Sequence, residues 1–246
     1  MPGGPMRDGG VRRLLANWRT VLADVVLAGR LRLTGGHCRP QVEALRRGAL
    51  APVVMIPGVY ESWRFMLPLA ERVHAAGHPV HLLPELGWNR RPIPRQAALV
   101  AAGLAERQLR GVVLLGHSKG GLIGKRLMLA EDPERRVDRL VTLATPFHGS
   151  SYARLMLQPA LREFRPRAAM LAALAGEPSV DARITSIYPE WDEHLPGGSL
   201  LPGAHNVEVP VRGHFRVLVD PRAAAAVLAA IDAGRRGPAH HGRSAN

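Results

Sequence analysis

The sequence predicts an α/β protein with a mostly parallel sheet of about six strands and helices on both faces. From about residue 50 onward, short apolar runs alternate with longer segments whose apolar residues recur at helical spacing. The run Val112–Leu115 is apolar without interruption, which is typical of a strand that is covered on both faces. Strands and helices that alternate at these lengths favour parallel strands joined by helical crossovers.

Each element is predicted from its own pattern. Strands are expected where several apolar residues follow one another, and helices where apolar residues recur every three or four positions. The 246 residues suffice for one domain with a buried core. The expected strands cover residues 52–56, 80–83, 111–115, 140–144, 183–187 and 206–209, and the expected helices cover residues 62–76, 95–109, 120–130 and 221–233.

Three segments depart from this alternation. Residues 1–49 begin with a Gly- and Pro-rich lead, expected to be flexible over residues 1–10, and continue as an amphipathic helix expected to pack on the core. Residues 150–177 are rich in Leu, Met and Arg and are expected to form a helical cap inserted between two strands. Residues 234–246 are expected to be a disordered tail, so the folded domain is predicted over residues 50–233.

The composition narrows the function classes. A net charge of +13 comes from 33 Lys and Arg against 20 Asp and Glu, but the Arg residues are scattered and no aromatic residues are interleaved with them. Nucleic-acid binding is therefore not expected, and contact of the first helix with a membrane surface is conceivable but not expected. Cys38 is the only cysteine, so no intrachain disulfide forms. Because no convincing signal peptide or membrane span is found, the cytoplasm is the expected location.

The strongest chemical signal is the segment Gly116-His117-Ser118-Lys119-Gly120, which matches G-x-S-x-G between an apolar strand and a helix. A tight strand-to-helix turn lifts the serine hydroxyl above the end of the strand, and the two glycines leave room for that turn. The helix N-terminus favours negative charge beside the serine. Ser118 is therefore the predicted nucleophile, and the Lys119 backbone N–H a predicted oxyanion donor. The glycine spacings of nucleotide-binding loops are absent.

With these residues in place, the chain resembles the α/β-hydrolase superfamily and, within it, the lipase- and esterase-like serine hydrolases. The resemblance spans about residues 50–233 and implies the α/β-hydrolase fold, with nucleophile, acid and base in that chain order. It is carried by Ile56–Tyr60, Gly116–Gly121, Thr145–Ser150 and Gly213–Phe215.

A serine nucleophile needs a base, and the base needs an orienting acid. His214 is the expected base, because it follows the last predicted strand in a Gly-containing loop, where the resemblance places the catalytic histidine. Three carboxylates follow strand 183–187 closely enough to be the acid. Asp192 is the preferred one and Glu190 the alternative, while Glu193 also qualifies by position.

The remaining site residues are expected around these three. The second oxyanion donor should be a backbone N–H after the first strand, at Val59 or alternatively at Tyr60. Tyr60, His117, Phe147 and His148 are expected near the substrate pocket. No metal site is expected because His, Cys and Asp do not cluster at zinc-like spacing, and the chemistry requires no cofactor.

The predicted activity is cleavage of a carboxylic ester through an acyl-serine intermediate that water then hydrolyses. The Leu- and Met-rich cap favours a small-molecule or lipid ester with an apolar acyl group, and a cap that packs for stability alone is the alternative. Acyl transfer and the cleavage of thioesters or amides by the same residues stay open. A non-catalytic binding protein of this fold is disfavoured, because the sequence contains a candidate nucleophile, acid and base in the chain order that the resemblance implies. The sequence does not indicate the oligomeric state.

Overall fold

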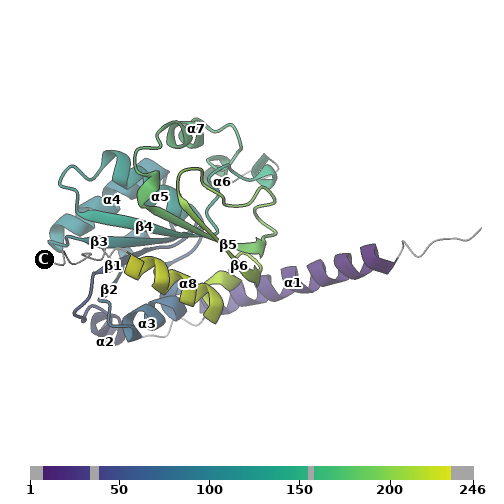
Figure 1. Cartoon of the computed structure of the whole chain (residues 1–246), viewed down its shortest axis with the longest axis horizontal. Coiled ribbons are helices and arrows are strands. Elements are labelled where there is room, and N and C mark those ends of the chain that lie inside the picture. Colours follow the sequence, from purple (N-terminus) through teal and green to yellow (C-terminus); the bar gives the residue numbers. More distant parts are fainter. Residues whose placement is uncertain (1–7, 34–38, 155–157, 234–246) are drawn as a thin grey trace, which may run out of the picture.

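A six-stranded parallel sheet forms the centre of the structure, a computed structural model that describes residues 8–33, 39–154 and 158–233 (Figure 1). The strand order is β2-β1-β3-β4-β5-β6, and every neighbouring pair is parallel. The fold class predicted from the alternation of elements is thus confirmed. The strands are β1 (Val53–Ile56), β2 (Val80–Leu82), β3 (Val112–His117), β4 (Val137–Leu143), β5 (Ile184–Trp191) and β6 (His205–Arg212).

Helices cover the sheet on both faces, as Figure 1 shows. The longer ones are α1 (Asp8–Leu33), α3 (Leu67–Ala75), α4 (Ile93–Glu106), α5 (Lys119–Ala130), α7 (Ala169–Gly176) and α8 (Pro221–Asp232). Short helices α2 (Arg39–Ala44) and α6 (Pro159–Arg162) and the single turns η1 (Trp63–Met66), η2 (Pro84–Leu86), η3 (Ser151–Arg154), η4 (Asp181–Arg183) and η5 (Arg216–Leu218) join them. Of the single turns, η1 lies within the predicted helix 62–76 and η3 within the predicted cap, whereas the sequence patterns did not predict η2, η4 and η5.

The unbroken apolar strands divide their side chains between two core regions. In β3, Val113 and Leu115 pack with α3 and α8, whereas Val112 and Leu114 pack with α4 and α5. Successive side chains of a strand point to opposite faces, so both faces of β3 need an apolar cover. This arrangement explains why the strand is apolar at every position rather than at alternate ones.

Strand β5 is longer than expected. The apolar pattern predicted its end at residue 187, but β5 runs to Trp191 and pairs with β6 over most of that length. Tyr188, Pro189 and Glu190 are polar or unusual for a strand, and a register shift between Pro189 and Trp191 accommodates them. The extension carries the chain directly to Asp192 at the carboxyl edge of the sheet.

The predicted cap lies between β4 and β5 and consists of η3, α6 and α7, above the sheet in Figure 1. Leu171 and Leu174 of α7 are buried in the core region shared with α4 and α5. The cap is therefore anchored by apolar packing as well as covering the carboxyl edge of the sheet.

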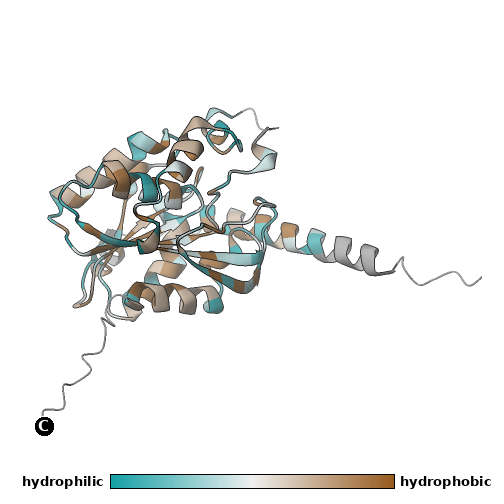
Figure 2. Cartoon of the chain, turned by 45° about the horizontal axis from the view of Figure 1, so that its top comes forward, coloured by the Kyte–Doolittle hydropathy of each residue, from teal (hydrophilic) through white to brown (hydrophobic). Residues whose placement is uncertain are grey.

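Helix α1 projects from the body of the protein, with only its C-terminal part against the domain (Figures 1 and 2). Leu27 and Leu31 pack on the core, but neither belongs to the apolar residues from which this helix is predicted. Trp18 and Leu22 are 71% and 64% exposed, so the expectation that the whole stripe packs on the core is wrong. Among the described helices, none has the length and hydropathy needed to cross a membrane.

Some predictions fall on residues outside the described part of the chain. These concern most of the N-terminal lead, Cys38, the cap residues 155–157 and the C-terminal tail from residue 234. The lead is shorter than expected, because α1 begins at Asp8.

The turn between β3 and α5 should not tolerate a side chain at Gly120. A Cβ atom there would overlap the backbone oxygen of Ile56 on β1. We expect Gly120→Ala to lower the free energy of unfolding by about 1–3 kcal/mol in urea denaturation. Gly176→Ala is the matched control, because a Cβ atom added there would meet no other atom within 4 Å, and it should stay within about 0.5 kcal/mol of wild type. Equal losses in both variants would contradict the packing argument.

Candidate active site

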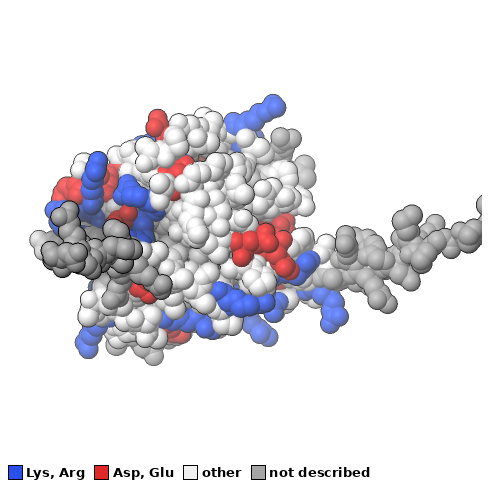
Figure 3. All heavy atoms as spheres, in the orientation of Figure 1, with Lys and Arg blue, Asp and Glu red and all other residues white. Residues whose placement is uncertain are grey.

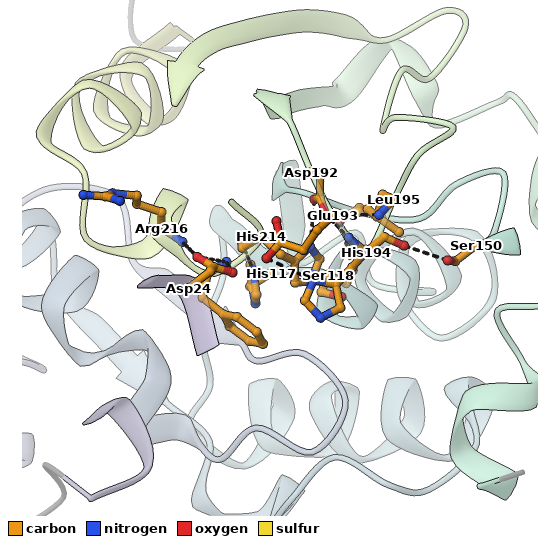
Figure 4. Close-up of polar contacts among 12 residues, drawn as sticks. Asp24, His117, Ser118, Ser150, Asp192, Glu193, His194, Leu195, His214 and Arg216 are labelled. Atoms are coloured by element: carbon orange, nitrogen blue, oxygen red, sulfur yellow. Dashed lines mark hydrogen bonds and ion pairs between the residues drawn. The ribbon is translucent and has the colours of Figure 1, made fainter. Parts of the chain in front are cut away.

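Three sequence-predicted residues meet at the carboxyl edge of the sheet. Ser118 follows β3, Asp192 follows β5, and His214 lies two residues after β6. Because all the strands are parallel, their carboxyl ends lie along the same edge. Figure 4 shows the side chains of these three residues converging there. The order of the strands thus brings together residues that lie far apart in the sequence.

Ser118 occupies a strained backbone conformation, with φ 51° and ψ −118°, at the N-terminus of α5. Its N–H donates to the Leu143 carbonyl at 2.8 Å, and the Thr145 hydroxyl donates to its carbonyl at 3.0 Å. A Cβ atom at Gly116 would come within 2.5 Å of the Gly120 backbone, which explains the glycine spacing of the motif. Strain of this kind persists only where the surrounding structure fixes it, and it is concentrated at functional sites.

His214 is held by Asp192. The His214 Nδ1 atom lies 2.8 Å from the Asp192 Oδ2 atom, and both side chains are buried. An ionised carboxylate only accepts hydrogen bonds, so Nδ1 carries the proton and Nε2 is left as the basic nitrogen. The other oxygen of Asp192 accepts from the backbone N–H groups of His194 and Leu195 at 2.8 and 3.0 Å. The carboxylate is thus oriented on both sides.

The alternative acid lies elsewhere. Glu190 is exposed within β5, and its carboxylate is 3.7 Å from the guanidinium of Arg212. Glu193 contacts the neighbouring His194 side chain rather than His214. The geometry therefore favours Asp192 among the three carboxylates that the sequence offered.

Burial sets the protonation of this pair. Burial lowers the pKa of His214, and the Asp192 charge opposes this shift only in part, while nearby His194 and His117 lower the pKa further. Burial raises the pKa of Asp192, but the His214 charge and hydrogen bond and the His194 N–H bring it below its usual range. The result is an ionised carboxylate beside a neutral imidazole, which is the state a general base requires.

Two backbone amides are available for an oxyanion. Among the described residues, neither the Val59 N–H nor the Lys119 N–H has an acceptor in the protein. Val59 lines the same cavity as Ser118, and Lys119 begins α5. The neighbouring Gly58 N–H is already engaged, because it donates to Glu61 at 2.8 Å. Val59 and its predicted alternative Tyr60 both line this cavity, and both N–H groups stay candidates for the donor after β1.

The Lys119 side chain has a separate, structural position. It is fully buried, and its ammonium donates to the Arg91 carbonyl at 2.7 Å and lies 3.1 Å from the Glu163 carboxylate. Burial lowers the pKa of Lys119, and Glu163 opposes that shift. Since Glu163 directly follows α6, this ion pair ties the start of α5 to the cap.

A cavity of about 640 Å³ opens beside Ser118 and His214, and most of its wall is apolar. The cap contributes Leu161 and Phe164, and the segments after β1 and β6 contribute Phe65 and Phe215. Tyr60 lines it as expected. Helix α1 also lines it, through Val25, Ala28, Gly29 and Arg32, a contribution that the sequence did not predict.

The other three expected pocket residues do not line this cavity. The His117 ring is fully buried behind Ser118. Phe147 is buried in the core region shared with α4 and α5. His148 is exposed, and its Nε2 atom lies 2.9 Å from the Leu200 carbonyl. His117 is expected near the site as part of the motif, and Phe147 and His148 as part of the lipase-like segment Thr145–Ser150, but none of them is among the residues that line the cavity.

His117 forms a buried ion pair that the sequence did not predict. Its Nδ1 atom lies 2.9 Å from the Glu61 carboxylate, and its Nε2 atom lies 3.1 Å from the His214 carbonyl. Both nitrogens face acceptors, so both carry protons and the ring is an imidazolium. Burial lowers the pKa of His117, but Glu61 and the His214 carbonyl raise it above its usual value. The pair fixes the backbone of His214 from beneath.

A second carboxylate reaches the same loop from α1. Asp24 is buried and accepts from the N–H groups of Phe215 and Arg216 at 2.9 and 3.0 Å (Figure 4). Burial and the adjacent Glu193 raise the pKa of Asp24 to about 7. Burial raises the pKa of Glu193, but hydrogen bonds with His194 and Asp24 bring it to about 2. Of these two carboxyl groups, Asp24 therefore binds a proton more readily than Glu193. The hydrogen bonds of Asp24 fasten the loop after His214 to α1.

Two groups of side chains could offer ligands to a metal ion. Asp192, His194 and His214 form one group, and Asp24, Glu193 and His194 form the other, with ligand atoms within 4.8 Å of one another. In the first group a metal would have to displace the hydrogen bond between Asp192 and His214. In the second, the Asp24 oxygens already accept two backbone N–H groups and hold a proton near neutral pH. The donor sets fit hydrogen bonding better than metal binding.

Comparisons with known proteins agree with this architecture. Residues 97–164 match the family model of the PGAP1-like alpha/beta domain. No curated protein has a sequence that matches this chain. Among solved structures, the chain is similar to the mature lipase BlEst2 of Bacillus licheniformis, with 19% identity, a TM-score of 0.56, and coverage of 74% of this chain and 89% of that one.

Two further structures share the fold. Aspergillus fumigatus lipase B has 19% identity and a TM-score of 0.61, with 74% of this chain and 52% of that chain covered. N-formylmaleamic acid deformylase from Pseudomonas putida has 17% identity and a TM-score of 0.56, with 74% and 92% covered. The chain has the α/β-hydrolase fold, as the sequence predicts.

The pKa values of His214 and His117 should be shifted in opposite directions. We expect NMR of the imidazole groups to show His214 protonating below the usual value of about 6.5, because it is buried, and His117 above it, because Glu61 stabilises the cation. Glu61→Gln should lower the His117 midpoint, since a neutral amide stabilises the cation less. Glu208→Gln is the control: it changes an exposed carboxylate on β6 and should leave the His117 midpoint unchanged. An unchanged His117 midpoint in Glu61→Gln would contradict the ion pair.

Proposed function

We propose that this protein is a serine hydrolase that cleaves carboxylic esters through an acyl-serine intermediate. The observation that carries the proposal is the 2.8 Å hydrogen bond between His214 Nδ1 and Asp192, beside Ser118 in its strained turn and facing one cavity. A hydroxyl, a buried neutral imidazole and an orienting carboxylate are the three parts that activate a serine. Hydrolases with this fold are the wider class to which the comparisons point.

The reaction would proceed in two halves. The Ser118 hydroxyl attacks the ester carbonyl while His214 Nε2 takes its proton, and the imidazolium then protonates the departing alcohol. Water next attacks the acyl-serine with His214 as base, which releases the carboxylic acid and restores the serine hydroxyl. Asp192 keeps Nδ1 protonated and stabilises the transient imidazolium. No cofactor or metal is needed for these steps.

The free amides of Val59 and Lys119 are the proposed oxyanion donors. Charge develops on the carbonyl oxygen during both attacks, and two fixed N–H groups stabilise it without reorganisation. Loss of one such donor costs about 2.7–4 kcal/mol in enzymes of this kind. The N-terminus of α5 adds a favourable dipole at the same position.

The cavity supports an ester with an apolar acyl group. A volume of about 640 Å³ lies within the usual range of small-molecule sites, and Phe65, Leu161, Phe164 and Phe215 form much of its wall. Two of the structural neighbours are named as lipases. Lipid or medium-chain esters are therefore the proposed substrates, and a location in the cytoplasm and the absence of nucleic-acid binding stay predictions.

A related activity on the same residues is the second candidate. The same serine chemistry serves acyl transfer and the cleavage of thioesters or amides, and one structural neighbour is a deformylase. Initial rates on an ester, a thioester and an amide of the same acyl group, with and without an alcohol acceptor, would separate these activities. In a non-catalytic protein, the arrangement of Ser118, His214 and Asp192 would have no chemical role.

Ser118→Ala should abolish covalent labelling by a fluorophosphonate probe, because the probe forms its bond with an activated serine oxygen. The loss should be complete by mass spectrometry, and turnover of p-nitrophenyl esters should fall by at least about 10⁴-fold. Ser151→Ala, at an exposed serine in the cap, is the control and should label as wild type does. Labelling that persists in Ser118→Ala would exclude Ser118 as the nucleophile.

Asp192→Asn should reduce kcat by about 10³–10⁴-fold, because an amide at this position no longer fixes the His214 tautomer. Glu190→Gln should stay within about twofold of wild type, since its carboxylate faces Arg212. Both variants can be measured on p-nitrophenyl esters of increasing chain length. A larger loss in Glu190→Gln than in Asp192→Asn would move the acid to Glu190.

A further inference from the structure

Helix α1 exposes an apolar face that nothing in the described structure covers. Trp18, Leu22, Val25 and Val26 are 71%, 64%, 58% and 46% exposed and lie on one side of the helix; we call them the α1 stripe. Spacings of four, three and one residues place them within one face of a 3.6-residue repeat. A contiguous exposed apolar patch of this kind marks an interaction surface.

The charges beside the α1 stripe are basic. Arg19, Arg30 and Arg32 are exposed on the same helix. Asp24 is the only acidic residue among the described side chains of α1, at positions 17–32, and it is buried against the loop after His214. Figure 3 shows basic side chains in blue, together with a group of acidic side chains in red, on the side of the protein from which α1 projects. The exposed surface of the helix therefore combines large apolar side chains with positive charge.

The α1 stripe is continuous with the mouth of the cavity beside Ser118. Val25 belongs to both, and the next turns of the helix line the cavity through Ala28, Gly29 and Arg32. Arg32 is itself held in place, because it donates to the Tyr60 carbonyl at 3.3 Å and lies 5.7 Å from the centre of the Trp88 ring. Trp88 is 45% exposed and extends the apolar surface beyond the helix.

We propose that the α1 stripe docks on an anionic lipid surface, with α1 lying along the surface and the cavity mouth facing it. Trp and aliphatic side chains enter the boundary between headgroups and acyl chains, and flanking arginines bind the lipid phosphates. The Asp24 hydrogen bonds to Phe215 and Arg216 fix the angle at which α1 leaves the domain. This docking proposal goes beyond the proposed hydrolase activity and does not depend on it.

A second copy of the chain is the competing occupant of this surface. Two α1 stripes packed together would bring the arginines of both helices close to one another, with no exposed acidic side chain at positions 17–32 to pair with them. Like charges at that distance repel, whereas lipid phosphates neutralise them. Charge complementarity therefore favours the lipid surface.

The test is co-sedimentation of the full chain with vesicles, measured without any substrate turnover. We expect binding to vesicles of equal parts phosphatidylcholine and phosphatidylglycerol, and much weaker binding to phosphatidylcholine alone or at high salt. The double variant Trp18→Ser/Leu22→Ser should lower the partition coefficient at least about tenfold. Arg19→Gln should lower it about fivefold on the anionic vesicles only.

Leu200→Ser is the matched control, because Leu200 is 49% exposed in a loop outside α1 and should leave vesicle binding unchanged. All variants should keep the wild-type circular dichroism and melting temperature, since the altered side chains are exposed. Absence of wild-type binding, or equal binding of wild type and the double variant, would overturn the proposal. A wild-type dimer in sedimentation velocity that the double variant converts to a monomer, without vesicle binding, would assign the surface to a second copy instead.

Discussion

The loop that carries His214 is fixed by three carboxylates from three separate parts of the chain. Asp192 binds the His214 ring, Glu61 acts through the His117 imidazolium on the His214 carbonyl, and Asp24 binds the next two amides. Each contact is buried, so each is little screened by solvent. A basic nitrogen can serve as a proton acceptor at a fixed place only if its loop is held in this way. The same loop forms part of the cavity wall beside Ser118, through His214 and Phe215.

The electrostatics of this loop are arranged to keep His214 neutral. Burial lowers the pKa of His214, and the neighbouring His117 imidazolium lowers it further, while the Asp192 carboxylate offsets part of the shift. The rings of His117 and His194 both lie beside the His214 ring, with centroids 5.0 and 4.7 Å from it. Only His214 combines a lowered pKa with a place on the cavity wall beside Ser118. Differences in environment thus assign different protonation states to chemically identical side chains.

Helix α1 contributes both to the wall of the cavity and to an exposed apolar surface. Its C-terminal turns form part of the cavity wall, and Asp24 connects it to the loop after His214, 191 positions away in sequence. Its N-terminal turns stand clear of the domain and expose Trp18 and Leu22. A helix that precedes the sheet in sequence therefore contributes to the candidate site. The cap on the opposite wall is held differently, by core packing and by the ion pair between Lys119 and Glu163.

The sequence by itself determined the fold class and the position of Ser118. Both follow from local rules: alternating apolar patterns define strands and helices, and the glycine spacing around Ser118 is imposed by close backbone approach within a few residues. It also placed His214 and Asp192 after strands whose carboxyl ends share one edge of the parallel sheet.

Only the tertiary structure decided the rest. The sequence preferred Asp192 over Glu190 but did not predict that β5 extends to Trp191, which is maintained by pairing with β6 rather than by a local apolar pattern. The Glu61–His117 pair, 56 positions apart, and the Asp24 contact left no periodic signal in the sequence. Burial and the approach of distant side chains are properties of the packed chain, and they fix which residues share a cavity, which carry a proton, and which face of α1 stays exposed.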